Sequence, residues 1–238
     1  PAFAKNQSIM WAVHQIYNTL VEIDSNLNIV PSLAKSWEVS EDRKTYRFHL
    51  RTNVYFTNDD AFKGGNGRKL VAADVAYSLG RIIDKTVASS GAWIFNGRVD
   101  SVMPFVVIND STFELRLQRP FHPIMGILST QYCSVVPKEV VEKYGKDFRR
   151  HPCGTGPFTL KSWDEGEALI LHKNKNYWEL DSAGVKLPYL DAVKINFFDN
   201  KATEFLQFTL GAQHQLTDDL KIDAMIGRAS SEFDNPVQ

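Results

Sequence analysis

Apolar and polar side chains alternate over several short stretches of this chain, which is the pattern of half-buried strands. In residues 46–51, three apolar side chains alternate with Arg47, His49 and Arg51. The polar run 40–44 before them predicts a hairpin turn, with Trp37 packed at one edge of this small sheet. Similar patterns predict further strands at residues 54–56, 112–117, 134–136, 157–162, 168–173 and 192–198.

Apolar residues at helical spacing predict helices between these strands. Residues 71–85 are a clear case, because Asp74 falls in the first turn, where an acidic side chain is favoured. The glycine-rich stretch 59–69 before this helix predicts an exposed loop. The other predicted helices are 8–21, 121–128, 138–144 and 203–210. The last of them follows a strand, so we expect an α/β chain that ends in a βα unit.

Composition narrows the class of protein. The 238 residues suffice for one large domain or two small ones, and 43% hydrophobic content is typical of a soluble protein with substantial cores. The 27 basic and 28 acidic residues leave a formal charge of −1 without a long run of one sign. A nucleic-acid-binding surface or a polybasic membrane anchor is therefore not expected. No stretch approaches the roughly 18 apolar residues of a membrane span.

The cysteines and histidines do not predict a catalytic or metal site. Cys133 and Cys153 are interpreted as two buried thiols, although a disulfide between them stays open in an oxidising compartment. His151 stands two positions from Cys153, a spacing that does not suit a nucleophile and its base. The other histidines are scattered without the spacing of metal ligands. We therefore expect neither an enzyme nor a bound metal or cofactor.

Several segments together resemble one protein family. Residues 28–50 read NIVPSLAKSWEVSEDRKTYRFHL. Downstream, in order, come LVAADVAYSL at 70–79, TFELRL at 112–117, HPCGTGPF at 151–158, KNKNYW at 173–178 and LPYLD at 187–191. These segments resemble the motifs of the family 5 extracytoplasmic solute-binding proteins, which deliver oligopeptides, dipeptides or nickel complexes to ABC importers. The resemblance covers roughly residues 3–211, and we expect agreement to fail beyond Gly211.

The resemblance implies a fold. It is a class II periplasmic-binding-protein-like lobe of α/β type that carries an inserted α+β subdomain, with the second lobe absent. Residues 1–32 and 150–238 would form part of the first lobe, and residues 33–149 the inserted subdomain. The family's first strand would precede Pro1. Because the chain opens without a methionine, we also expect a secretion signal to have been removed or left out.

Residues 154–157, Gly-Thr-Gly-Pro, are the most diagnostic part of the resemblance. We expect a bend with unusual backbone angles at both glycines, where the chain returns to the first lobe. A phosphate-binding loop is the alternative. It is disfavoured because no Lys-Ser/Thr pair follows and the next segment is a predicted strand rather than a helix.

The function implied by the resemblance is binding. The chain would belong to the substrate-binding component of an ABC importer that delivers di- or oligopeptides to its permease. It would act in the periplasm or on the outer face of the cytoplasmic membrane, with a lipid anchor, as a monomer that binds no nucleic acid. A nickel-complex receptor and a sensing or interaction module on the same scaffold stay open as alternatives.

By resemblance, three segments of this chain face the ligand: residues 6–10, 89–93 and 130–133. Backbone amides and hydroxyls there would bind a peptide main chain, while Met and Trp would form adaptable apolar walls. Trp93 and Tyr132 are equally compatible with core positions, and Met10 on a helix is core by default. Arginines found in some nickel-complex receptors are replaced by Ser90 and Thr130, which argues against a multiply anionic ligand. The candidates are Asn6, Gln7, Met10, Ser89, Ser90, Gly91, Trp93, Thr130, Gln131, Tyr132 and Cys133.

Overall fold

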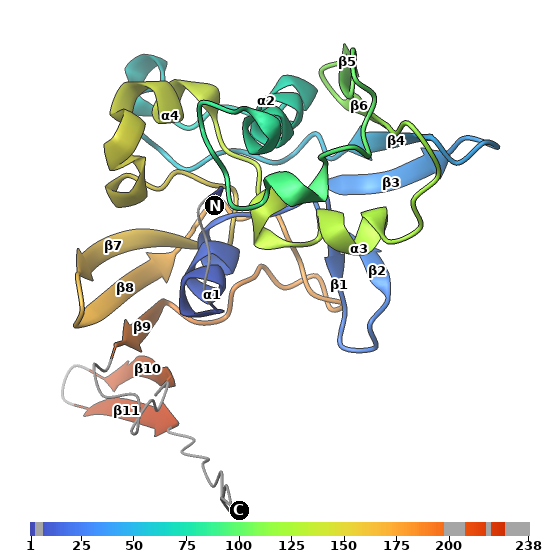
Figure 1. Cartoon of the computed structure of the whole chain (residues 1–238). Coiled ribbons are helices and arrows are strands. Elements are labelled where there is room, and N and C mark those ends of the chain that lie inside the picture. Colours follow the sequence, from blue (N-terminus) through green and yellow to red (C-terminus); the bar gives the residue numbers. More distant parts are fainter. Residues whose placement is uncertain (3–6, 198–207, 218–219, 227–238) are drawn as a thin grey trace, which may run out of the picture.

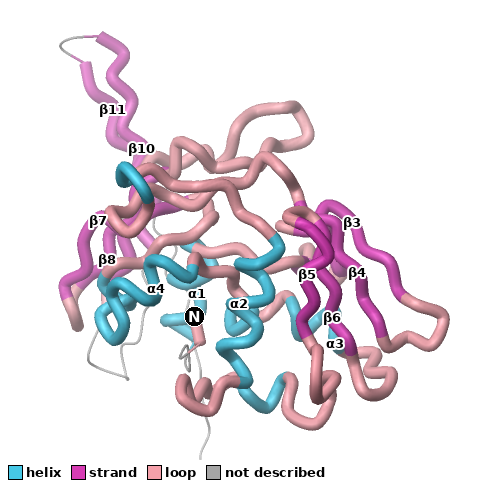
Figure 2. The backbone as a smooth tube through the Cα atoms, turned by 90° about the horizontal axis from the view of Figure 1, so that it is seen from above, coloured by secondary structure: helices cyan, strands magenta, loops and turns pink. Residues whose placement is uncertain are grey.

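The computed structural model describes residues 1–2, 7–197, 208–217 and 220–226. Two antiparallel sheets lie on opposite sides of a helical middle layer, as the view from above shows (Figure 2). A third, two-stranded sheet pairs β1 (Val21–Ile23) with β2 (Ile29–Pro31). The predicted mixture of helices and strands is confirmed, while the division into a first lobe and an inserted subdomain stays a prediction.

The chain begins with α1 (Gln7–Ile16), which is shorter than the helix predicted for residues 8–21. The prediction is wrong at the C-terminal end, where Val21 already belongs to β1. The backbone of the intervening residues pairs with a distant segment instead: Leu33 N donates to Thr19 O (3.1 Å) and Ala34 N to Leu20 O (2.9 Å). Long-range pairing therefore overrides the local helical pattern.

The first large sheet has the strand order β3-β4-β6-β5. Its alternation is as predicted, because Tyr46, Phe48 and Leu50 are buried while Arg47 is exposed. Trp37 lies in the sheet opposite Phe48. The strands are β3 (Ala34–Val39), β4 (Thr45–Leu50), β5 (Phe105–Asn109) and β6 (Thr112–Arg116).

Two of the predicted strands form no ladder. In residues 54–56, Tyr55 makes an isolated bridge to Lys69. In residues 134–136, the amide of Val135 donates to Asn18 O (3.0 Å) and that of Val136 to Ser78 Oγ (2.9 Å). The partners are single residues or a side chain rather than a neighbouring strand, so the strand predictions are wrong, although Val54, Phe56, Val135 and Val136 are buried.

Helices cover the first sheet and fill the space between the two large sheets (Figure 1). The helix predicted for residues 71–85 is α2, which buries Val75, Leu79 and Ile82. The predictions for 121–128 and 138–144 are also confirmed. The α-helices are α2 (Ala72–Ile83), α3 (Ile124–Leu128) and α4 (Lys138–Tyr144). Short 3₁₀ turns are η1 (Lys63–Gly65), η2 (Ala92–Ile94), η3 (Gln131–Cys133) and η4 (Gly145–Arg150).

The second large sheet has the strand order β11-β10-β9-β8-β7. Its antiparallel pair β7–β8 contains the strands predicted for residues 157–162 and 168–173. The helix predicted for residues 203–210 is wrong in its last three residues, which lie in β10, where Phe208 pairs with Ile195; residues 203–207 are outside the described part. β9 and β10 are antiparallel, so the predicted βα unit is replaced by a strand pair. The strands are β7 (Phe158–Asp164), β8 (Ala168–Lys173), β9 (Ala192–Asn196), β10 (Phe208–Thr217) and β11 (Leu220–Ile226).

The Gly-Thr-Gly-Pro segment runs against the end of α1. The predicted unusual angles are wrong, because neither Gly154 nor Gly156 has a positive φ. Both glycines are required for close approach instead: Gly156 N donates to Ile16 O (2.9 Å), and a β-carbon at position 154 would lie 2.1 Å from that same oxygen. The segment therefore joins the N-terminal helix to the start of β7.

Candidate functional site

The structure places the loop after α2 beside the start of the chain and beside Tyr132. Ser89 Oγ donates to the carbonyl oxygen of Ala2 (2.7 Å) and accepts from Gly91 N (3.1 Å), which ties the loop after α2 to the N-terminal segment. The ring of Tyr132 covers Gly91, because a β-carbon there would lie 2.8 Å from two ring atoms. Ser89 and Ala2, which are 87 positions apart in the chain, are thus neighbours in the fold.

Trp93 has an exposed side chain. It lies in η2, and 54% of its surface is accessible. Of the two positions that the sequence left open for Trp93, core and pocket wall, the exposure excludes the core. The exposed indole stands two residues after Gly91, which the half-buried Tyr132 covers, and it provides apolar contact area at the surface.

The remaining candidates differ in accessibility. Met10 and Thr130 are half-buried, and the Thr130 hydroxyl donates to Ile127 O (2.7 Å). The hydroxyl oxygen of the half-buried Ser90 is shielded and makes no hydrogen bond to the described part of the chain. Cys133 is only 1% exposed, so its side chain belongs to the core, and burial raises the pKa of its thiol to about 12. Asn6 lies outside the described residues, as does the side chain of Gln7.

Apolar grooves lie on both flanks of α1. One, of about 520 Å³, is lined by Ile9 and Val13 of the helix and by Leu160 and Trp163 of β7. The other, of about 380 Å³, is lined by Trp11 of α1, Gln131 of η3, and Leu190, Val193 and Ile195 on the sheet side. The second groove reaches the candidate segment that contains Tyr132. The face of the molecule that carries α1 is therefore both hollow and apolar.

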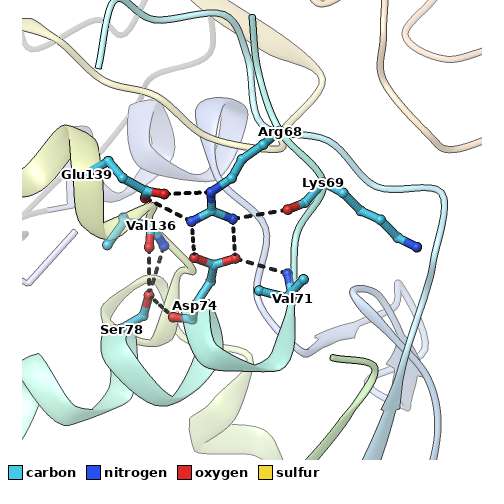
Figure 3. A network of polar contacts seen from close by, with 7 residues as sticks. All are labelled: Arg68, Lys69, Val71, Asp74, Ser78, Val136 and Glu139. Carbon is cyan, nitrogen blue, oxygen red and sulfur yellow. Dashed lines mark hydrogen bonds and ion pairs between the residues drawn. The ribbon is translucent and has the colours of Figure 1, made fainter. Parts of the chain in front are cut away.

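A partly buried polar network links helices α2 and α4, which lie next to the candidate segments in the sequence (Figure 3). Arg68 binds both carboxylate oxygens of Asp74 in α2 (2.6 and 2.8 Å) and both of Glu139 in α4 (2.7 and 2.8 Å). The Arg68 hydrogen bonds hold the pKa of Glu139 below its usual range. Ser78 adds a second link, since its hydroxyl donates to Asp74 O and accepts from Val136 N. Sequence analysis missed this network, because the partners Arg68 and Glu139 are 71 positions apart.

The arrangement does not resemble a catalytic centre. His151 stacks on Tyr144, with ring centroids 3.9 Å apart, while Cys153 Sγ contacts Thr57 O at 3.2 Å. Burial raises the pKa of the Cys153 thiol to about 12, so the thiol is neutral. Across the part of the chain that the structure describes, no three His, Cys, Asp or Glu side chains are grouped to hold a metal ion. The helices of this same part are all too short or too polar to cross a membrane.

Comparisons with known proteins agree with the resemblance. The model of the family "bacterial extracellular solute-binding proteins, family 5 Middle" matches residues 28–225. The match continues past Gly211, so the expected loss of agreement beyond that residue is wrong.

Curated relatives are longer proteins. The probable ABC transporter periplasmic-binding protein SapA of Escherichia coli K12 is 33% identical over 177 residues, which are 69% of this chain and 32% of SapA. The dipeptide-binding protein of the same strain is 31% identical over 176 residues, 68% of this chain and 32% of the relative. This chain thus spans about a third of the length of these relatives.

Solved structures share the fold. The periplasmic binding protein DppA of Helicobacter pylori, in complex with the peptide STSA, superposes with a TM-score of 0.73 at 29% identity, covering 85% of this chain and 41% of DppA. An oligopeptide-binding protein of Borrelia burgdorferi superposes with a TM-score of 0.72 at 27% identity, with the same coverages of 85% and 41%.

Proposed function

Because this chain belongs to the family 5 bacterial extracellular solute-binding proteins, we propose that it is one lobe of a receptor that binds peptides and delivers them to an ABC permease. The fold is that of a class II periplasmic-binding-protein lobe. The protein acts outside the cytoplasm, as the family does. The lipid anchor and the monomeric state expected from the sequence stay predictions.

One observation carries the proposal. The solved structure of Helicobacter pylori DppA, which superposes on this chain with a TM-score of 0.73 at 29% identity, contains the bound peptide STSA. The relatives named for transport or binding of peptides include the Salmonella typhimurium SapA protein at 33% identity and the Escherichia coli dipeptide-binding protein at 31%. Peptides are therefore the class of ligand that we propose for this chain.

The geometry suits one wall of a peptide site. Trp93 and Tyr132 would provide apolar surface, and backbone groups of the loop that contains Ser90 would pair with a peptide main chain. The open flanks of α1 would be covered by the second lobe when the two lobes close over the ligand. Ser90 and Thr130 carry no charge, so a nickel complex held by paired arginines gains no support from these positions.

Calorimetry tests the proposal. The experiment needs a longer protein in which this lobe is joined to a second lobe, called the two-lobe protein below. A mixture of di- to pentapeptides titrated into the two-lobe protein should give binding heat. The same mixture should give none with the 238-residue chain alone, because a ligand held by one wall stays half solvated. Micromolar binding to the single lobe would overturn the two-lobe argument. Failure of the two-lobe protein to bind any member of the mixture would overturn peptide as the ligand class.

A further inference from the structure

Arg98 contacts the turn that carries Trp93 and also Phe121, a residue that precedes the candidate segment of Tyr132. Its Nη1 donates to the carbonyl oxygen of Trp93 and to that of Ile94 (3.1 Å), both in η2. Its guanidinium carbon lies 4.8 Å from the centre of the Phe121 ring. Phe121 lies just before α3, the helix that leads to Thr130 and Tyr132. One side chain therefore contacts both the turn that carries Trp93 and the segment that leads to Tyr132.

The backbone around Arg98 is fixed as well. Arg98 N donates to Phe95 O (3.0 Å), and Arg98 O accepts from Gln118 N (2.8 Å). Arg98 forms no ion pair with the described acidic side chains. Its donors are directed at the carbonyls that end η2, which is a stabilising arrangement for a cation at the C-terminal end of a helical turn.

This arrangement has a consequence for the exposed indole. A three-residue turn has little stability of its own, since isolated helical turns are unfavourable. Trp93 has 54% of its surface accessible, so few contacts of its own side chain can hold the turn in place. The fully buried Ile94 and Phe95 anchor the end of the turn. The hydrogen bonds from Arg98 to the carbonyl oxygens of Trp93 and Ile94 add to that anchor and help to set the orientation of Trp93.

We propose that Arg98 is a positioning residue for peptide binding: it fixes the turn that presents Trp93 and couples that turn to Phe121. The proposal rests on the proposed function, because it requires that Trp93 contacts the ligand. Lysine cannot replace arginine here, since an ammonium group lacks the planar fork that reaches two acceptors while stacking on a ring.

Arg51 provides a matched control elsewhere in the fold. Its Nε donates to Ser32 O (2.7 Å), and its guanidinium carbon lies 4.6 Å from the centre of the Trp178 ring. It thus combines a carbonyl contact and an aromatic contact, as Arg98 does, but on segments that contain none of the candidate site residues. Arg51→Lys should affect stability without affecting ligand affinity.

A double-mutant cycle in the two-lobe protein tests the proposal. Arg98→Lys should weaken peptide binding about 3- to 10-fold, and this loss should disappear in a Trp93→Ala background, because interacting residues give non-additive effects. If Arg98→Lys does not fold, Phe121→Leu replaces it, because leucine keeps an apolar side chain but removes the ring. Phe121→Leu should also weaken peptide binding, and this loss should also disappear in the Trp93→Ala background. Arg51→Lys should bind as the parent protein does.

A spectroscopic measurement on the 238-residue chain complements the cycle. Among the indole N–H signals of the five tryptophans, the one lost in Trp93→Phe should shift in Arg98→Lys, while the Trp178 signal should not. Equal losses from Arg98→Lys in both backgrounds, or an unmoved Trp93 signal, would overturn the positioning role. If Trp93→Ala leaves peptide affinity unchanged, the proposed site itself is wrong and Arg98 loses its role with it.

Discussion

The carbonyl oxygen of Ile16 occupies the space beside Gly154 in which any other residue would place its β-carbon. The distance from that oxygen to an added β-carbon is 2.1 Å, far below van der Waals contact. A β-carbon at position 156 would also be too close, at 2.5 Å from the carbonyl carbon of Ile16. This contact joins the last turn of α1 to the strand β7, and so fixes the N-terminal side of the candidate site to the second sheet.

Replacement of Gly154 by alanine should destabilise the protein. We expect Gly154→Ala to lower the free energy of unfolding by roughly 1–3 kcal/mol or more, because backbone atoms must move to relieve the overlap. Gly80→Ala is the matched control, since Gly80 lies inside α2 with no atom near the added carbon, and it should stabilise by up to about 1 kcal/mol. Urea unfolding of both variants measures the difference. Similar effects of the two substitutions would contradict the close-packing account.

Replacement of Trp93 should separate binding from folding. Trp93→Ala removes an exposed side chain, so the free energy of unfolding should change by less than about 0.5 kcal/mol. Peptide affinity of the two-lobe protein should fall by roughly 1–3 kcal/mol, as for an aromatic wall of a binding pocket. Chemical denaturation and calorimetry measure the two quantities. A large loss of stability with unchanged affinity would assign Trp93 to the structural core.

Glu114 should contribute to stability in a pH-dependent manner. Its side chain is only 4% exposed and lies between Arg47 (2.8 Å) and Arg116 (2.7 Å). Burial raises the pKa of Glu114, but the hydrogen bonds from Arg116 and Arg47 outweigh burial and lower the pKa below its ordinary value of 4.5. A carboxyl whose pKa is lower in the folded state stabilises the protein above its unfolded pKa, and that contribution is lost as the pH falls through the folded pKa.

Glu114→Gln isolates this contribution. The variant should be less stable than the parent protein above about pH 5, and the difference should shrink as the pH falls below about 4. Urea unfolding across this range measures it. A difference that stays constant with pH would show that the Glu114 charge does not matter and that only the shape of the side chain does.

The cysteines should behave as unreactive free thiols. Both Cys133 and Cys153 are buried and unpaired, and burial raises the pKa of each thiol to about 12. A thiol reagent at about pH 8 should label neither in the folded chain and both after denaturation, because the thiolate is the reacting form. Denatured but unreduced protein in which neither thiol reacts would reveal a disulfide instead.

Local patterns predicted much of the fold. The alternation at Tyr46, Phe48 and Leu50 and the spacing of Val75, Leu79 and Ile82 each reflect one buried face of one element, so the residues alone reveal it. The end of α1 could not be predicted, because Thr19 and Leu20 pair with a segment further along the chain. The requirement for Gly154 was correctly noticed but assigned to the wrong cause, since its neighbour Ile16 is distant in sequence.

The candidate site was likewise predicted only in part from the sequence. The segments that contain Ser89 and Tyr132 were named from a family resemblance, and the structure places them side by side. The burial of the Cys133 side chain and the exposure of Trp93 depend on how those segments pack, which no local pattern encodes. Arg98 carried no signal in the sequence, because its contacts to Trp93 and Phe121 exist only in the folded chain.

Amide hydrogen exchange of the two-lobe protein, with and without a bound peptide, tests the central claim most directly. If this lobe forms one wall of the peptide site, peptide should slow exchange in the segments 89–95 and 130–136. The strands β4 and β6, which contain none of the candidate site residues, should exchange at unchanged rates. Protection of β4 and β6 with no change at 89–95 and 130–136 would contradict the account and move the ligand to another face of the lobe.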